Sequence, residues 1–325
     1  MDSRDAGRKR IQTMAREKLH AFAPTGRTRE HGNVEHSQRS KATQALPSIL
    51  DADLISNTQA PSPSPCSRDG ETPVGGCNRC RGLAPLDFDF SMAFQPIVDV
   101  HSDKVWAWEA LVRGPQGEGA GSVLSRVTDD NRYQFDQHCR IRAIELAHGL
   151  GIPARLSINF LPNAVYEPRA CIRATIEAAN RVGFPLERLQ FEITEVEEVR
   201  NDGHLRRIVE EYRAIGFGTA IDDFGAGYAG LNLLTHFQPD VLKIDMNLVR
   251  NIDQDRTRRL IVRNLVQLAG ELPCTLIAEG IETLDEARCL ADLGITLHQG
   301  YAYARPGFES LPQPDTAMLE KVKAG

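Results

Sequence analysis

The chain has 325 residues, 41% of them hydrophobic, and a formal net charge of −6 at pH 7. This length is enough for one large core or two domains, and because no run reaches 18 consecutive apolar residues we expect no membrane span. The first 50 residues hold 10 Lys and Arg against 5 Asp and Glu; the rest hold 28 against 39 and are acidic, which argues against specific nucleic-acid binding by the body of the chain.

Residues 1–85 do not read as a folded domain. Apolar residues are sparse there, and the Pro-Ser-Pro-Ser-Pro run at 61–65 is typical of a linker. We therefore expect a basic, largely disordered N-terminal extension and linker. Contact of this arm with RNA or anionic lipid is the weaker alternative to a solvated tail. The chain start lacks the apolar stretch of a secretory signal, which favours a cytoplasmic location.

Seven cysteines, an odd and scattered set, argue against a disulfide framework and fit a reducing compartment. Cys77 and Cys80 have the spacing of a zinc site, and Cys66 would add a third thiolate. A fourth ligand and a second C-x-x-C pair are missing. An extension that makes few specific contacts is therefore favoured over a Zn²⁺ site.

From about residue 88 the pattern changes to alternating strands and helices. Two strand-like runs, Met92–Val100 and Val105–Arg113, predict a hairpin. The helices that follow are expected at 135–150, 166–182, 203–215, 228–237, 255–271 and 283–293. The strands between them are expected at 155–160, 188–194, 217–222, 240–245, 274–279 and 296–302.

Alternation of this kind favours a parallel sheet, and eight strands in about 220 residues suit a closed barrel. The predicted fold class is α/β, a (β/α)8 TIM-like barrel with one antiparallel strand contributed by the opening hairpin. No Gly-x-Gly-x-x-Gly turn follows a strand, so a dinucleotide-binding fold is the weaker choice. We place the barrel at residues 86–312 and a C-terminal tail at 313–325.

Polar side chains stand at the far end of nearly every expected strand. In a barrel of this type those ends meet at one rim, where active sites lie. A crowd of carboxylates there needs positive charge, and oxygen ligands suit Mg²⁺ or Mn²⁺. The residues concerned are Glu109, Asn159, Glu192, Glu195, Asp222, Asp223, Lys243, Asp245, Glu279 and Gln299.

Adjacent carboxylates at Asp222 and Asp223 point to two metal ions per site. Such a pair of ions suits displacement at a phosphodiester, and Lys243 adds a positive charge for phosphate or for the attacking water. The glycine-containing loop after Asp223 can close on a substrate or simply turn from strand to helix.

At these residues the chain resembles the EAL-domain cyclic-di-GMP phosphodiesterases of bacteria. The name-giving tripeptide is Glu109-Ala110-Leu111, followed by Val112-Arg113. The resemblance covers about residues 90–308. The remaining blocks are Gln95-Pro96-Ile97, Ser157-Ile158-Asn159, Glu192-x-x-Glu195, Asp222-Asp223-Phe224-Gly225, Lys243-Ile244-Asp245, Ala278-Glu279-Gly280-Ile281-Glu282 and Gln299-Gly300-Tyr301.

The resemblance implies hydrolysis of cyclic-di-GMP to linear pGpG with two Mg²⁺ or Mn²⁺ ions. It assigns metal ligation to six residues: Glu109, Asn159, Glu192, Asp222, Asp223 and Glu279. Asp222 would bridge the two ions, Lys243 would touch the water between them, and Glu279 is also a candidate general base.

The same resemblance assigns Gln95, Leu111 and Arg113 to substrate contact. Glu282 and Gln299 would complete the surroundings of the metal ligands, Gln299 also facing substrate. Glu195 would brace the loop after Asp223, against the alternative of a solvated charge. Because relatives are thought to couple this loop to dimerisation, a homodimer through the barrel and a regulatory protein are candidate partners.

The loop after Asp223 departs from many relatives, since it reads Gly-Ala-Gly-Tyr-Ala-Gly-Leu over 225–231 without their hydroxyl side chains. No metal-binding or catalytic position is substituted. Two rival functions stay open: a catalytically silent cyclic-di-GMP receptor or partner-binding module, and a two-metal hydrolase of another nucleotide.

Overall fold

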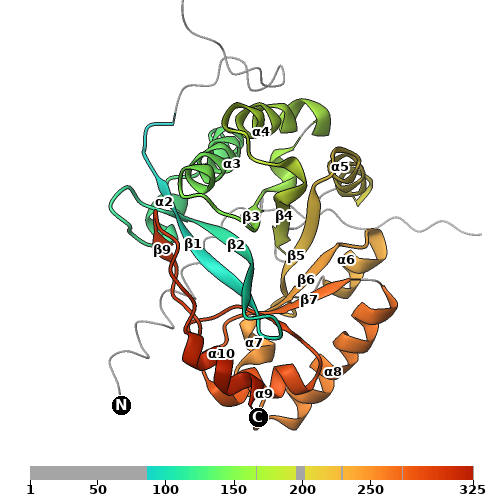
Figure 1. Cartoon of the computed structure of the whole chain (residues 1–325). Helices are drawn as coiled ribbons and strands as arrows, with labels where there is room; N and C mark the ends of the chain where they lie inside the picture. The colour runs from blue at the N-terminus through green and yellow to red at the C-terminus, as the bar shows by residue number, and fades with distance from the viewer. Residues whose placement is uncertain (1–85, 166, 195–201, 228–229, 273, 325) are drawn as a thin grey trace, which may run out of the picture. The chain divides into compact units, whose positions relative to one another are not determined.

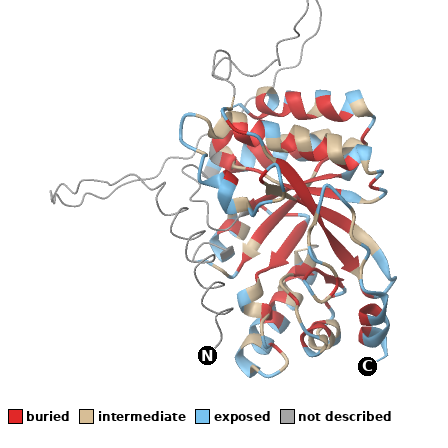
Figure 2. Cartoon of the chain, turned by 90° about the vertical axis from the view of Figure 1, so that its left-hand side faces the viewer, coloured by how far each residue is buried: buried red, intermediate tan, exposed pale blue. Residues whose placement is uncertain are grey.

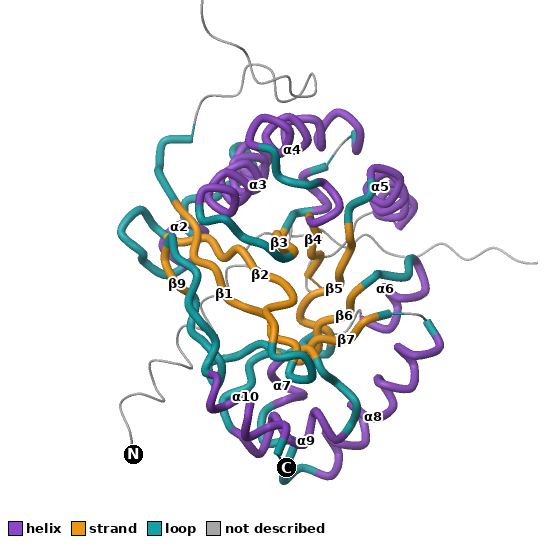
Figure 3. Tube along the Cα trace, viewed as in Figure 1, coloured by secondary structure: helices purple, strands orange, loops and turns teal. Residues whose placement is uncertain are grey.

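A computed structural model describes residues 86–324 of the chain, except residues 166, 195–201, 228–229 and 273. Within these residues the strands lie at the centre and the helices around them (Figures 1 and 3). The strands are β1 (Ser91–Asp99), β2 (Lys104–Arg113), β3 (Arg155–Asn159), β4 (Leu189–Thr194), β5 (Gly218–Phe224), β6 (Val241–Ile244), β7 (Thr275–Ala278), β8 (Leu297–His298) and β9 (Gly307–Phe308).

The first eight strands close into a barrel. Strands β2 to β8 pair in chain order and in parallel, and β1 lies antiparallel between β8 and β2. The predicted barrel with one antiparallel strand is thereby confirmed. Because β1 runs the other way, its last residue Asp99 lies at the end of the barrel where β2 begins, whereas the carboxyl ends of β2 to β8 gather at the opposite rim.

The helices connect successive strands on the outside of the barrel (Figure 1). They are α2 (Ala120–Leu124), α3 (Arg132–Gly149), α4 (Pro168–Val182), α5 (Asp202–Ile215), α6 (Gly230–His236), α7 (Met246–Val249), α8 (Arg256–Glu271), α9 (Leu284–Asp292) and α10 (Thr316–Lys323), with 3-10 turns at Pro162–Ala164 and Leu186–Arg188. The expected helices are present, with ends shifted by up to three residues; α2, α7 and α10 were not expected.

The burial of the side chains explains the apolar patterns of both the strands and the helices. The strands are buried along nearly their whole length, and the helices bury one face and expose the other (Figure 2). This is the pattern of a parallel sheet covered by helices. A separate apolar cluster fills the inside of the barrel at the end opposite the carboxylate rim; its members are Ile97, Ala107, Ala220, Val241, Ile277 and Leu297.

The expected C-terminal tail, 313–325, contains a packed helix. Helix α10 begins after Asp315, whose side chain accepts from the backbone N–H of Met318 at 3.0 Å. Met318, Leu319 and Val322 are buried. Their spacing gives an eight-residue helix one apolar face, a pattern too short to stand out in the sequence.

Among the described residues, no helix combines the length and the apolar character that crossing a bilayer requires. The extension at 1–85, including Cys66, Cys77 and Cys80, lies outside the described residues, and so does Glu195. The predictions for them stay predictions.

Candidate two-metal site at the carboxylate rim

The strands bring the predicted polar groups to one place. Glu109, Glu192 and Asp222 lie on β2, β4 and β5, and Lys243 lies on β6. Glu279 and Gln299 follow the last residues of β7 and β8. All of these side chains are buried except that of Glu279, which is partly exposed.

An irregularity in β5 lets two consecutive carboxylates serve one site. Neighbouring residues of a regular strand point to opposite faces. Here Ile221 pairs with Leu242 and Phe224 pairs with Ile244, so Asp222 and Asp223 together stand opposite Lys243 alone. Asp223 has a φ of 54°, an uncommon left-handed conformation for a residue other than glycine. Such bulges re-aim side chains, and they concentrate next to active sites.

Glycines let the rim loops approach one another closely. Gly225 has a φ of 95°, and a Cβ on it would lie 2.4 Å from Cδ1 of Leu248. Gly280, directly after Glu279, has a φ of 67°, and its Cβ would lie 2.4 Å from Cβ of Met246. Any larger residue at either position would push α7 away from the loops that hold the carboxylates.

Lys243 is the centre of the carboxylate cluster. Its Nζ lies 2.8 Å from Glu192, 2.8 Å from Asp222, 2.6 Å from Glu279 and 3.4 Å from Glu109. Its side chain is fully buried. One ammonium therefore offsets part of the charge of four carboxylates. Positive charge of this kind is needed because carboxylates close together repel one another.

The excess negative charge shifts the acid–base equilibria of the cluster. Burial raises the pKa of Glu192 to about 8, and the Glu109 and Asp222 charges add to this against Lys243. Burial also raises the pKa of Glu279 well above its usual range, and that of Asp223 to about 7. Burial alone would lower the pKa of Lys243, but the carboxylates outweigh it and raise that pKa, so the lysine stays charged.

Amides and a hydroxyl fix the orientation of two carboxylates. Asn159 and Gln299 donate to the two oxygens of Glu109, at 3.1 Å and 2.6 Å. Ser157 donates a short hydrogen bond to Glu192 and accepts one from Gln190 at 2.9 Å. The carboxylates are thus held from behind, which is the arrangement found around metal ligands.

Two overlapping groups of residues could hold a metal ion. Glu109, Glu192 and Asp222 offer oxygens within 4.8 Å of one another, and so do Asp222, Asp223 and Glu279. Asp222 belongs to both groups. Among the described residues, the buried Oδ1 of Asp222 has an ion-pair contact with Lys243 at 2.8 Å but accepts no hydrogen bond. The buried Oε1 of Gln299 also accepts no hydrogen bond from the described residues. An all-oxygen set in which one carboxylate belongs to both groups fits a pair of hard divalent cations.

The predicted substrate-contacting residues surround this cluster on β1 and β2. Gln95 is paired with Glu109 across the two strands, and its amide donates to the carbonyl of Ala304 at 3.1 Å. Arg113, the last residue of β2, donates to the carbonyl of Val112 at 2.8 Å. Leu111 is partly exposed on the same strand. Glu282 is directed away from the cluster to Arg250, at 3.1 Å.

The sequence reading missed a buried polar network behind β3 and β4. Asp136 and Arg140 form a salt bridge at 2.5 Å and are both buried. Asp136 also accepts from the backbone N–H of Leu161 at 3.0 Å, two residues beyond Asn159. Arg140 contacts the hydroxyl of Tyr212 at 3.4 Å. The spacing of Asp136 and Arg140, four residues apart on one helix face, was the available signal.

Ser157 and Gln190 were also not assigned roles. Each lies two residues before a predicted ligand on the same strand, Asn159 or Glu192, and therefore on the same face. That period of two could have identified them from the sequence.

Comparison with known proteins shows which family the chain resembles. The EAL domain family matches residues 85–306. A standalone EAL protein from Vibrio cholerae O395, solved in a cyclic-di-GMP-bound form, is 53% identical with a TM-score of 0.70, over 72% of this chain and 99% of that one. BlrP1 of Klebsiella pneumoniae, solved with manganese and cyclic-di-GMP, is 34% identical with a TM-score of 0.66, over 69% of this chain and 58% of that one.

Curated relatives are longer proteins. The antirepressor BluF of Escherichia coli K12 is 32% identical over 222 residues, which is 68% of this chain and 55% of BluF. The probable cyclic di-GMP phosphodiesterase PdeI of the same organism is 33% identical over 227 residues, 66% of this chain and 28% of PdeI. The chain thus spans about half of BluF and about a quarter of PdeI.

Proposed function

The chain belongs to the EAL domain family, and on that premise we propose that it hydrolyses cyclic-di-GMP to linear pGpG with the help of two Mg²⁺ or Mn²⁺ ions. One observation carries the proposal. Two groups of carboxylates meet within 4.8 Å, share Asp222 and surround one buried lysine. Relatives described with cyclic-di-GMP, and in one case with manganese, support it.

In this proposal Glu109, Asn159, Glu192 and Asp222 would hold one cation, and Asp222, Asp223 and Glu279 would hold the other. When bound, such a pair of cations activates water and offsets the charge that develops on the phosphoryl oxygens. Asn159 would contribute its amide oxygen, and its nitrogen donates to Glu109 at 3.1 Å. The hydrogen bonds on Glu109 and Glu192 keep those oxygens aimed at the site.

The chemistry breaks one P–O3′ bond of the cyclic dinucleotide. A water oxygen forms the new bond to phosphorus, its proton passes to a base, and the 3′ oxygen leaves and gains a proton. Glu279 is the candidate for that base because its carboxylate lies at the rim, 2.6 Å from Lys243 and within one group with Asp222 and Asp223. Lys243 would keep a positive charge beside the phosphate, since its pKa is raised.

Substrate contacts are proposed for Gln95, Leu111, Arg113 and Gln299. Arg113 stands at the rim end of β2, where its planar fork can take a phosphate oxygen pair. Gln299 keeps one buried oxygen without a hydrogen-bond donor among the described residues, so a ligand donor can take it. Glu195 remains a proposed brace for the loop after Asp223.

The decisive assay incubates the purified chain with cyclic-di-GMP and separates the products by chromatography. Mg²⁺ or Mn²⁺ should yield pGpG, a chelator should stop the reaction, and Ca²⁺ should support it poorly, because its longer and looser coordination misplaces the reacting groups. Binding of cyclic-di-GMP without product under Mg²⁺ and Mn²⁺ would instead favour the silent-receptor function. Turnover of another cyclic nucleotide in its place would favour the second rival.

We further propose that the protein acts in the cytoplasm. The odd, scattered set of seven cysteines supports this, since it fits a reducing compartment better than a disulfide framework.

A further inference from the structure

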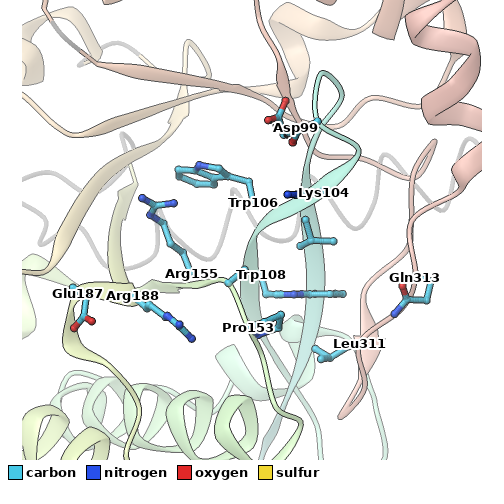
Figure 4. A pocket seen from close by; sticks show the side chains of 13 residues that line it. Asp99, Lys104, Trp106, Trp108, Pro153, Arg155, Glu187, Arg188, Leu311 and Gln313 are labelled. Atoms are coloured by element: carbon cyan, nitrogen blue, oxygen red, sulfur yellow. Dashed lines mark hydrogen bonds between the residues drawn. The ribbon is translucent and has the colours of Figure 1, made fainter.

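A second cavity lies at the end of the barrel opposite the carboxylates. It has a volume of about 800 Å³, and it is lined where β1 ends and where β2, β3 and β4 begin. Figure 4 shows its side chains, among them Trp106, Trp108 and Arg155. Its lining includes none of the carboxylates of the rim, nor Lys243 or Gln299, so this cavity is separate from the candidate active site.

A β-bulge directs Trp106 into this cavity. Ile97 pairs with Ala107 and Val98 pairs with Val105, so Trp106 is the extra residue on β2. The ring packs against the apolar cluster inside the barrel and stays partly exposed. The bulge gives Trp106 a different facing from Trp108, and both side chains line the cavity, Trp108 as a buried residue.

Three positively charged side chains lie around the partly exposed Trp106. The Arg155 guanidinium lies 4.7 Å from the centre of the Trp106 ring, a cation–π contact. Arg155, Arg188 and Lys104 are exposed, and within the part of the chain that the structure describes none of them has an ion-pair partner. Of the two carboxylates in the cavity, Asp99 already accepts from His101 and Ser102, at 2.9 Å and 2.7 Å. Glu187 is the second carboxylate, so the three cations and two carboxylates that line the cavity leave a net charge of +1.

We propose that this cavity binds a nucleoside phosphate. A stacked tryptophan and arginine form a flat surface on which a base of any kind can stack. The three cations then supply donors for its phosphate, and the volume falls in the range of small-ligand sites. Positive charge on this face is otherwise unexpected, because residues 51–325 carry a net charge of −11.

Tryptophan fluorescence tests this directly, since the chain has two tryptophans and both line the cavity. The full chain is titrated with GMP in chelator, so that hydrolysis is switched off. We expect a saturable change in emission with GMP and with AMP, and weaker binding of guanosine and of ribose 5-phosphate, which lack the phosphate or the base. Arg155→Glu and Arg188→Glu should each weaken GMP binding about fivefold or more.

Two controls separate this cavity from the carboxylate rim. Arg263→Glu, a charge reversal at an exposed position of α8, should leave the titration unchanged. Asp222→Ala should also leave it unchanged, whereas binding at the rim would respond to that substitution. No emission change at millimolar GMP would overturn the proposal. So would a change that survives in both folded charge-reversal variants, or one that disappears in Asp222→Ala.

Discussion

Replacing Lys243 tests how the carboxylate cluster is held together without metal. The lysine contacts four carboxylates and is fully buried, so Lys243→Met leaves several buried acidic groups without a cation. Loss of one partner from a buried ion pair typically costs about 3–5 kcal/mol of folding free energy. We therefore expect the metal-free variant to unfold at a clearly lower temperature than wild type.

The folding free energy that Lys243→Met loses relative to wild type should grow as the pH rises. Without the lysine, the cluster must take up about one further proton, and each pH unit above the ordinary carboxyl pKa of 4.5 makes that proton cost about 1.4 kcal/mol more. The variant should thus lose about 2.7 kcal/mol more at pH 8 than at pH 6. The sign follows because a carboxyl with a raised folded-state pKa loses stability as pH rises.

Thermal unfolding followed by circular dichroism at pH 6 and pH 8, with chelator or with Mg²⁺, measures this. At about 2–4 °C per kcal/mol for a domain of this size, the pH-dependent part corresponds to about 5–10 °C. Mg²⁺ should restore much of the loss, because it replaces the missing positive charge. Lys104→Met, at an exposed lysine without an ion-pair partner among the described residues, is the matched control. Equal deficits at both pH values, or no response to Mg²⁺, would refute the reasoning.

Three further changes examine individual roles. Glu279→Gln at saturating Mg²⁺ should lower kcat about 100-fold or more and change cyclic-di-GMP affinity much less, as steady-state kinetics and equilibrium binding will show; a wild-type kcat would remove Glu279 from proton transfer. Ser157→Ala removes the donor to Glu192 and should raise the Mg²⁺ concentration for half-maximal activity about tenfold, most strongly at low pH, whereas an unchanged titration would make Ser157 a packing residue. His298 donates from Nε2 to Ile295 and accepts from Tyr303 at Nδ1, and burial lowers its pKa to about 4. Because the unfolded chain binds this proton more readily, the folding free energy should fall by up to about 3 kcal/mol as pH falls from 6.5 toward 4. His298→Gln should flatten this dependence of stability on pH, and an unaltered dependence would assign it to other groups.

The periodicity of the sequence was sufficient to predict the barrel. The strand and helix ranges follow from apolar runs and their spacing, and the antiparallel strand follows from the hairpin before residue 113. Two bulges were beyond this reasoning. The one at Asp222 and Asp223 and the one at Trp106 depend on register between strands, which a single strand's pattern does not contain.

The residues of the candidate site could be predicted from the sequence, but their arrangement in space could not. Strand ends identified Glu109, Glu192, Asp222 and Glu279, because parallel strands end at one rim. The position of Lys243 among all four carboxylates was not predictable, since it depends on side-chain conformations that strand periodicity does not determine. The network of Asp136 was missed because its connection to Leu161 is a tertiary hydrogen bond between a helix and a distant loop.

The central claim is that the carboxylates form one site for two cations with Asp222 shared between them. Calorimetric titration with Mn²⁺, combined with electron paramagnetic resonance of the saturated protein, measures both the number of ions and their proximity. We predict two Mn²⁺ ions per chain with spectra of a magnetically coupled pair in the wild type, and weakened binding of both ions in Asp222→Asn. Binding of a single ion, or of two uncoupled ions that are insensitive to Asp222→Asn, would contradict the account.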